Sequence, residues 1–225
     1  DYGPTAHLRN EPYGWCWAAT AFLDGHPDYR TRFRHLQGQI DLPHQQFSDQ
    51  FLESLESEMR QVVEQWQLFV VNLDYGYDLR REAIVYEPVI VEPADGKSPG
   101  EVNVRVLADR GWQSTGIRVQ AGASYVFDAT GRFQVASDPE IWWCEPGGVT
   151  IRYWRGKPLG TLLAAVSDQS RPLAGLTPLS RPEAVGVHRE IVFPQAGTLF
   201  RRINDSPAEL EDNAGQLSVR VVRVD

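Results

Sequence analysis

The apolar positions of the first 92 residues recur at helical spacing. Between residues 47 and 73 they follow one another in steps of three and four, with Glu and Gln on the opposite face. This pattern predicts one amphipathic helix of about seven turns. An earlier helix is expected over 13–23, since Gly25 and Pro27 form a helix stop signal. Pro27 can also open a further helix, with its apolar side between residues 29 and 36.

The remainder of the chain alternates apolar and polar residues over short runs separated by Gly, Pro and Asp. Such runs are typical of the strands of a sandwich or jelly roll, and strands do not alternate with helices here. The fold class is therefore predicted as α+β in two parts: a small helical segment followed by an all-β, jelly-roll-like sandwich. The expected strands lie at 102–106, 117–119, 125–127, 149–154, 161–166, 190–193, 198–203 and 217–222.

A segment rich in Pro and Gly separates the two parts. It predicts a linker over residues 93–100, between a helical segment at 1–92 and a sandwich at 101–225. Charge divides at the same place. Residues 1–92 contain 7 Arg and no Lys against 15 acidic residues, whereas residues 93–225 contain 15 basic and 15 acidic residues. The whole formal net charge of −8 thus belongs to the helical part.

Composition excludes several classes of function. The acidic balance argues against nucleic-acid binding, which usually needs a basic face. No apolar run approaches the roughly 18 residues of a membrane span, and the polar start lacks the pattern of a secretory signal. We therefore expect the chain to be a piece of a larger protein. Its two cysteines, Cys16 and Cys144, make no disulfide framework and have no zinc-ligand spacing, and the sequence indicates no oligomeric state.

The loop at 203–215 is the richest in side-chain oxygens. It includes Asn204, Asp205, Glu209, Asp212 and Asn213 and lies between two predicted strands. Calcium takes about six to eight oxygen ligands from carboxylates, amides and main-chain carbonyls, so a loop that is acidic at both ends could enclose one ion. The alternative is a polar hairpin loop closed by ordinary turn residues.

Residues 101–225 resemble the PA-I-type galactophilic lectins, a family of calcium-dependent β-sandwich sugar-binding domains. The resemblance implies a calcium site with side-chain ligands Asp205, Asp212 and Asn213. The carbonyls of Glu209 and Val135 would complete the protein ligands, and two sugar hydroxyls would fill the remaining positions. The pieces that carry it are Thr115–Ile117, Gly122, Ala129–Gly131, Gly160–Leu162, Gly197–Leu199, Ile203–Asp205 and Asp212–Gly215.

One family feature is absent. The sugar-contacting His-Pro-x-Gln segment is replaced by 145–149, Glu-Pro-Gly-Gly-Val, with Trp142, Trp143 and Trp154 around it. Aromatic rings can stack on sugars, so the ligand is expected to be galactose-like or another glycan, bound in part by Trp142 and Trp143. The alternative is that these tryptophans belong to the sandwich core.

A second motif suggests a different class of function. Residues 14–20, Gly-Trp-Cys-Trp-Ala-Ala-Thr, resemble the nucleophile motif of papain-like cysteine peptidases, with Cys16 at a helix start. The position of the usual Gln is Asn10, and His188 is the sole histidine after residue 44, within the lectin-like half. Residues 21–92 also lack the β-barrel half of such an enzyme. We expect instead that Cys16 is buried on the core side of its helix.

The helical part is loosely similar to the helical tail of gluzincin-type metallopeptidase-like proteins, through residues 11–33 and 64–69. No His-Glu-x-x-His helix is present, so a catalytic part would lie upstream. The leading interpretation is a non-catalytic, calcium-dependent lectin-like module on the tail of a larger, exported bacterial protein, secreted or extracytoplasmic. The alternatives are the Cys16 peptidase and a structural or docking sandwich without metal.

Overall fold

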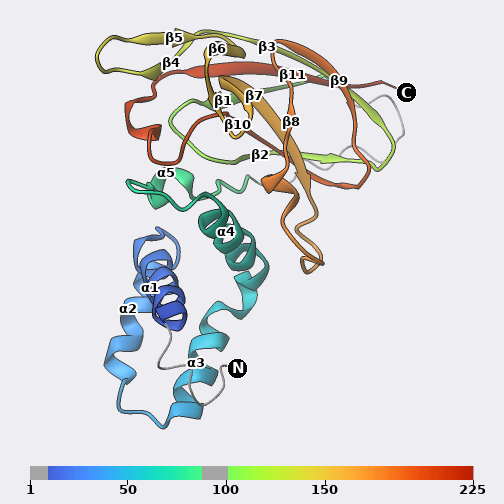
Figure 1. Ribbon diagram of the computed structural model, residues 1–225. Helices are drawn as coiled ribbons and strands as arrows, with labels where there is room; N and C mark the ends of the chain where they lie inside the picture. Colours follow the sequence, from blue (N-terminus) through green and yellow to red (C-terminus); the bar gives the residue numbers. More distant parts are fainter. Residues whose placement is uncertain (1–9, 88–100, 225) are drawn as a thin grey trace.

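The computed structural model describes residues 10–87 and 101–224, so the predicted linker at 93–100 lies outside the described residues. The first part is helical and the second consists of antiparallel strands, as predicted (Figure 1). Its helices are α1 (Asn10–Gly25), α2 (Arg30–His35), η2 (Leu36–Gln39), α3 (His44–Leu55), η3 (Glu56–Glu58), α4 (Met59–Asn72) and α5 (Leu79–Glu82). Two short helices lie within the second part, η4 (Pro178–Ser180) and η5 (Leu210–Asp212).

The single helix predicted over 47–73 is wrong, because α3 and α4 are separated by the turn η3. Arg32 of α2 contacts the chain at this break. Its Nη1 donates to the carbonyl of Ser54 at 2.9 Å, and its Nη2 pairs with Glu58 at 2.5 Å. The Ser54 carbonyl would otherwise accept the main-chain bond that continues an α-helix. The helix predicted at 13–23 is confirmed as α1, and the one after Pro27 as α2.

Two antiparallel sheets form the sandwich, with strand orders β1-β11-β3-β9 and β2-β10-β7-β6; β8 pairs with β7, and β4 pairs with β5 in a separate hairpin. Each predicted strand is present, and β4, β5 and β8 are additional. The strands are β1 (Val102–Leu107), β2 (Gln113–Val119), β3 (Ser124–Thr130), β4 (Phe133–Ala136), β5 (Trp142–Cys144), β6 (Gly147–Trp154), β7 (Lys157–Ser167), β8 (Glu183–Ala184), β9 (His188–Val192), β10 (Gly197–Ile203) and β11 (Gln216–Val224).

Inward-facing residues of both sheets build the main core. Along β3, Tyr125, Phe127 and Ala129 are buried in it, and along β11 every second residue from Leu217 to Val221 is buried. This alternation follows from the period of two along a strand. The helices have a smaller core of their own around Phe22 and Phe69.

A third apolar cluster joins the two parts. Leu68 of α4 and Ile84 after α5 pack with Trp112, Leu163 and Phe200 on the outer face of the β2-β10-β7 sheet. Figure 1 shows α4 and α5 between the sandwich and helices α1 to α3. The main chain continues the contact, because Val85 forms a parallel bridge with Gln113 at the start of β2.

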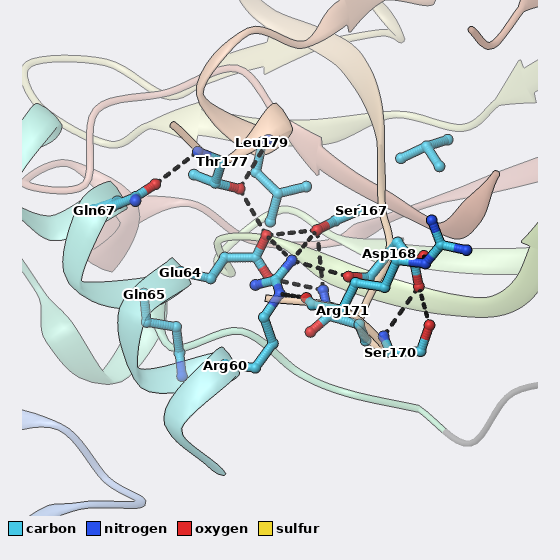
Figure 2. A network of polar contacts seen from close by, with 12 residues as sticks. Arg60, Glu64, Gln65, Gln67, Ser167, Asp168, Ser170, Arg171, Thr177 and Leu179 are labelled. Carbon is cyan, nitrogen blue, oxygen red and sulfur yellow. Dashed lines mark hydrogen bonds and ion pairs between the residues drawn. The ribbon is translucent and has the colours of Figure 1, made fainter. Parts of the chain in front are cut away.

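A buried polar network reinforces this interface (Figure 2). Glu64 of α4 is fully buried and accepts hydrogen bonds of 2.6 Å from Ser167 Oγ and Thr177 Oγ1. Gln169 Nε2 donates to it at 2.7 Å, and Arg60 lies 3.2 Å away as its ion-pair partner. Arg60 also donates from Nε to the carbonyl of Arg171 at 2.8 Å. Each of these donors except Arg60 belongs to the second part of the chain.

None of the described helices combines the length and the apolar character that a membrane crossing requires.

Candidate functional site

The loop between β10 and β11 is folded so that its two ends meet. Asp205 and Asn213 are both buried, and Asn213 Nδ2 donates to Asp205 Oδ2 at 2.8 Å. Asp205 Oδ1 accepts from the main-chain N–H of Ser206 at 2.7 Å, and Asn213 Nδ2 also reaches the carbonyl of Ala108 at 3.2 Å. Two of the predicted ligands therefore come together at the base of the loop.

Asp212 lies on the side of the loop that faces β4. Its carbonyl accepts from Gln134 Nε2 at 2.5 Å, and its Oδ2 accepts from the N–H of Ser137 at 2.9 Å. Gln134 and Ala214 form a main-chain bridge, so β4 runs beside the end of the loop. Val135 follows Gln134, with its side chain buried in the core, which leaves its main-chain carbonyl as its only possible ligand atom.

Several oxygens of this loop are buried without a hydrogen-bond partner. Asp212 Oδ1, Asn213 Oδ1 and Asn204 Oδ1 each lack a donor among the residues that the structure describes. The amide orientation of Asn204 is clear, because its Nδ2 donates to the carbonyls of Trp154, Lys157 and Pro158. Buried unpaired oxygens are rare in native proteins and often indicate an ion or water partner.

Burial also affects the charge of Asp205. It raises the pKa of this carboxyl to about 7, although the bonds from Asn213 and Ser206 favour the ionised form. A cation beside the carboxylate would lower this pKa, because an opposite charge stabilises the ionised form. The donor set is thus of the hard oxygen type that suits calcium.

Acidic residues alone do not make the site. Within residues 10–87 and 101–224, His, Cys, Asp and Glu side chains form no group of three or more able to hold a metal. The Glu209 side chain pairs instead with Arg152, while its N–H bonds the carbonyl of Ser206 at 2.9 Å. A cation site here would therefore need amide and main-chain oxygens beside the carboxylates of Asp205 and Asp212, as the resemblance implies for Asn213, Glu209 and Val135.

The two predicted sugar-binding tryptophans differ in their surroundings. Trp142 is half-buried and packs against the sandwich core, whereas Trp143 is 50% exposed. Trp143 is paired with Gln134 across the β4–β5 hairpin, so both side chains lie on one face. The guanidinium of Arg132 lies over the Trp143 ring, 5.3 Å from its centroid. The Trp143 ring therefore lies on the face of the hairpin from which Gln134 contacts Asp212.

The expected burial of Cys16 is wrong, because Cys16 is exposed. The buried residues described in α1 are Ala18, Phe22 and Leu23, which follow Cys16 along the helix. His188 lies on β9, in the second part of the chain, and bonds Asp128 at 2.6 Å. Cys144, the last residue of β5, is buried.

Two residues that support the loop were not singled out from the sequence. Arg202 of β10 and Glu82 of α5 form a buried ion pair, with Nη2 and Oε1 2.7 Å apart, and Arg202 also contacts the carbonyl of Asp205. These residues are 120 positions apart in the chain, and no local pattern relates them.

Comparisons with known proteins agree with the lectin resemblance. No protein-family model matches the chain, and no curated protein matches it. Nine solved chains match. One is the "EclA N-terminal domain; PllA-like lectin", which is 25% identical and covers 54% of this chain and 95% of its own length, with a TM-score of 0.42. This matched domain is a lectin, the class of protein that residues 101–225 are predicted to resemble.

A second match is Aeromonas hydrophila PliG, described as a periplasmic lysozyme inhibitor of g-type lysozyme. It is 11% identical and covers 63% of this chain and 97% of its own, with a TM-score of 0.28.

Proposed function

We propose that the sandwich, residues 101–225, is a calcium-dependent carbohydrate-binding module without catalytic activity of its own. The carrying observation is the loop after β10, where the buried carboxylate of Asp205 bonds Asn213, and where Asp212 and Asn213 each have a buried oxygen with no hydrogen-bond partner among the described residues. A purely structural loop would leave these oxygens unpaired at a free-energy cost of about 1–3 kcal/mol each.

In this proposal Asp205, Asp212 and Asn213 supply side-chain oxygens, and Glu209 and Val135 supply main-chain carbonyls. Bound calcium would offer its remaining coordination positions to sugar hydroxyls. The chain's own contribution is to hold the ligands in place. Asn213 fixes Asp205 at 2.8 Å, and Ser137 fixes Asp212 at 2.9 Å.

Trp143 is the proposed sugar platform beside this loop. Its exposed ring lies next to Gln134, which contacts Asp212. An indole ring can cover the apolar face of a sugar. The sequence also predicts Trp142 as a sugar contact, but its packing against the core supports a structural role instead. Galactose-like sugars and other glycans both remain ligands to be tested.

The wider context is also a proposal. The looser resemblance of residues 11–33 and 64–69 to a metallopeptidase-like helical tail supports a larger, exported bacterial parent. A glycan ligand agrees with a secreted or extracytoplasmic location.

The test combines a glycan array with calorimetry. The full chain is applied to the array with millimolar calcium and again with EDTA, and calcium binding is measured separately by titration calorimetry. We expect glycan signals that EDTA abolishes and one calcium bound per chain. Glycan binding unchanged by EDTA would contradict the calcium dependence, and a blank array together with no calcium heat would contradict the proposal.

A further inference from the structure

A buried ion pair connects the helical part to the candidate loop. The guanidinium of Arg202 pairs end-on with the carboxylate of Glu82, through Nη2–Oε1 at 2.7 Å and Nη1–Oε2 at 3.1 Å. Both side chains are at least 97% buried. The rings of Trp112 and Trp154 lie 5.8 and 5.5 Å from the guanidinium carbon and enclose it.

The same guanidinium holds the main chain of the loop. Arg202 Nη2 donates to the carbonyl of Asp205 at 3.0 Å, and Nε donates to the carbonyl of Ile203 at 3.2 Å. One planar group therefore binds Glu82 on one side and the backbone of the first proposed ligand on the other. Its orientation is set by the bidentate geometry that Arg forms with a carboxylate.

Further contacts fix α5 against the loop and the sandwich. The N–H of Asp78 donates to the carbonyl of Pro207 at 3.1 Å, within the loop itself. On the other side, the N–H of Gly111 donates to the carbonyl of Arg81 at 2.8 Å. A Cβ at position 111 would lie 2.9 Å from the Cα of Glu82, so glycine is required for this close approach.

We infer that Glu82 and Arg202 are positioning residues for the cation and sugar loop, so that α5 is a functional part of the site. This inference rests on the proposed function for the meaning of the loop, but the positioning itself is a property of the chain without any ion. A buried ion pair often adds little net stability compared with apolar residues. A role in positioning the loop accounts for the contact between Arg202 and the carbonyl of Asp205.

The consequence is a link between the helical part and ligand affinity. In a Glu82→Gln variant, Arg202 loses its charged partner. The guanidinium is then no longer held in the orientation in which it donates to the carbonyl of Asp205. Residues that orient metal ligands typically change metal affinity by about 10–100-fold when replaced. The expected effect of Glu82→Gln is therefore a loss of calcium affinity of about tenfold.

The experiment compares Glu82→Gln with Glu64→Gln in the full chain. Both replace a buried carboxylate between the helices and the sandwich, but Glu64 bonds Ser167, Gln169 and Thr177, which lie outside the loop at 204–213. Hydrogen exchange is measured without calcium at the N–H groups of Ser206 and Glu209, and calcium affinity is measured by calorimetry. Arg202→Lys, which keeps the charge without the bidentate pair, is the second variant.

We expect faster exchange at both amides and weaker calcium binding in Glu82→Gln and Arg202→Lys, with wild-type values in Glu64→Gln. Wild-type exchange and affinity in both Glu82→Gln and Arg202→Lys would overturn the inference, as would an equal effect of Glu64→Gln. If the wild-type chain binds no calcium but exchange accelerates only in the two loop-contact variants, the positioning role stands and the proposed function fails.

Discussion

The buried carboxylate of Glu64 accepts a hydrogen bond of 2.6 Å from the hydroxyl of Thr177, which lies 113 positions later in the chain. Thr177 Oγ1 in turn accepts from the N–H of Leu179 at 3.2 Å and so begins η4. The pair therefore joins the middle of α4 to the segment between β7 and β8, on the outer face of the sheet (Figure 2).

Replacement of Glu64 by Ala is expected to destabilise the whole chain. It leaves Arg60 without its ion-pair partner and removes the acceptor of Ser167 and Thr177. Breaking one side of a buried pair costs about 3–5 kcal/mol, and urea unfolding measures this as a lower midpoint. Glu53→Ala, at an exposed position of α3, is the matched control and should change little.

The same unfolding curves test the relation between the two parts. The apolar cluster and polar network across the interface predict one transition shared by helical and β signals. An early helical transition, unaffected by Glu64→Ala, would contradict this and favour independent units at 1–92 and 101–225.

Calcium is expected to raise the melting temperature of the wild-type chain. Binding to the folded state alone stabilises by about 2.7 kcal/mol at a hundredfold excess over Kd. The double variant Asp205→Ala with Asp212→Ala should lose this gain, as measured by thermal melts with EDTA and with millimolar calcium. Asp109→Asn, which affects the ion pair with Arg81 outside the loop, is the control and should retain the gain. Identical wild-type curves in the two solutions would argue against the site.

Replacement of Trp143 is expected to affect glycan binding, whereas replacement of Trp142 is expected to affect stability. Trp143→Ala should weaken glycan binding by about 1–2 kcal/mol, a common loss for a contacting aromatic residue, with little change in melting temperature. Trp142→Ala should chiefly lower stability, because its ring packs on the core. Calorimetry with a glycan selected from the array measures binding, and thermal melts measure stability. Weaker binding in Trp142→Ala and lower stability in Trp143→Ala would contradict the assignment of the two residues.

The two cysteines should react at very different rates. Cys16 is exposed, whereas burial raises the pKa of Cys144 to about 11. Because the thiolate is the reactive form, iodoacetamide should label Cys16 in the native protein and Cys144 only after unfolding. Peptide mass spectrometry measures both. A Cys16→Ser variant that loses glycan binding would show that this part of α1 contributes to the site.

His26 predicts a dependence of stability on pH. Its Nε2–H donates to Gln65 at 2.8 Å, and its Nδ1 accepts from the N–H of Asp28. Burial lowers its pKa below 6.5 in the folded chain, so below that pH the unfolded state binds the proton more readily. The stability that neutral His26 contributes is therefore present above pH 6.5 and is lost as pH falls below it.

The variant His26→Asn should show a smaller loss of unfolding free energy between pH 7.5 and pH 5 than the wild-type chain. The exposed His35→Gln is the control and should retain the wild-type difference. An equal pH difference in wild type and His26→Asn would contradict the assignment.

Local patterns predicted the elements better than the contacts between them. Alternation located the long strands, whereas β4 and β5 escaped because each has only three or four residues. The break between α3 and α4 was not predicted, and the side chain that contacts it, Arg32, lies more than 20 positions earlier. Periodicity placed Cys16 on an apolar face, but the buried residues described in α1 are Ala18, Phe22 and Leu23, all of which follow it.

The candidate loop was found because its oxygen-bearing residues are close together in the sequence. Asp205 and Asn213 are eight positions apart and do meet. Their support was not found, because Glu82 and Arg202 come from different parts of the chain and each looks like an ordinary surface charge in its local sequence. Long-range ion pairs of this kind have no periodic signature.

The order in which the chain leaves the ribosome gives the Glu64 and Glu82 contacts a further meaning. Both carboxylates are made early, while their partners at Ser167, Thr177 and Arg202 follow 103 to 120 residues later. Until β10 is complete, Glu82 has no Arg202 to pair with, and burial of its charge would be costly. The helices therefore cannot reach their final packing during the synthesis of the first part, and their folding awaits the sheet on which they rest.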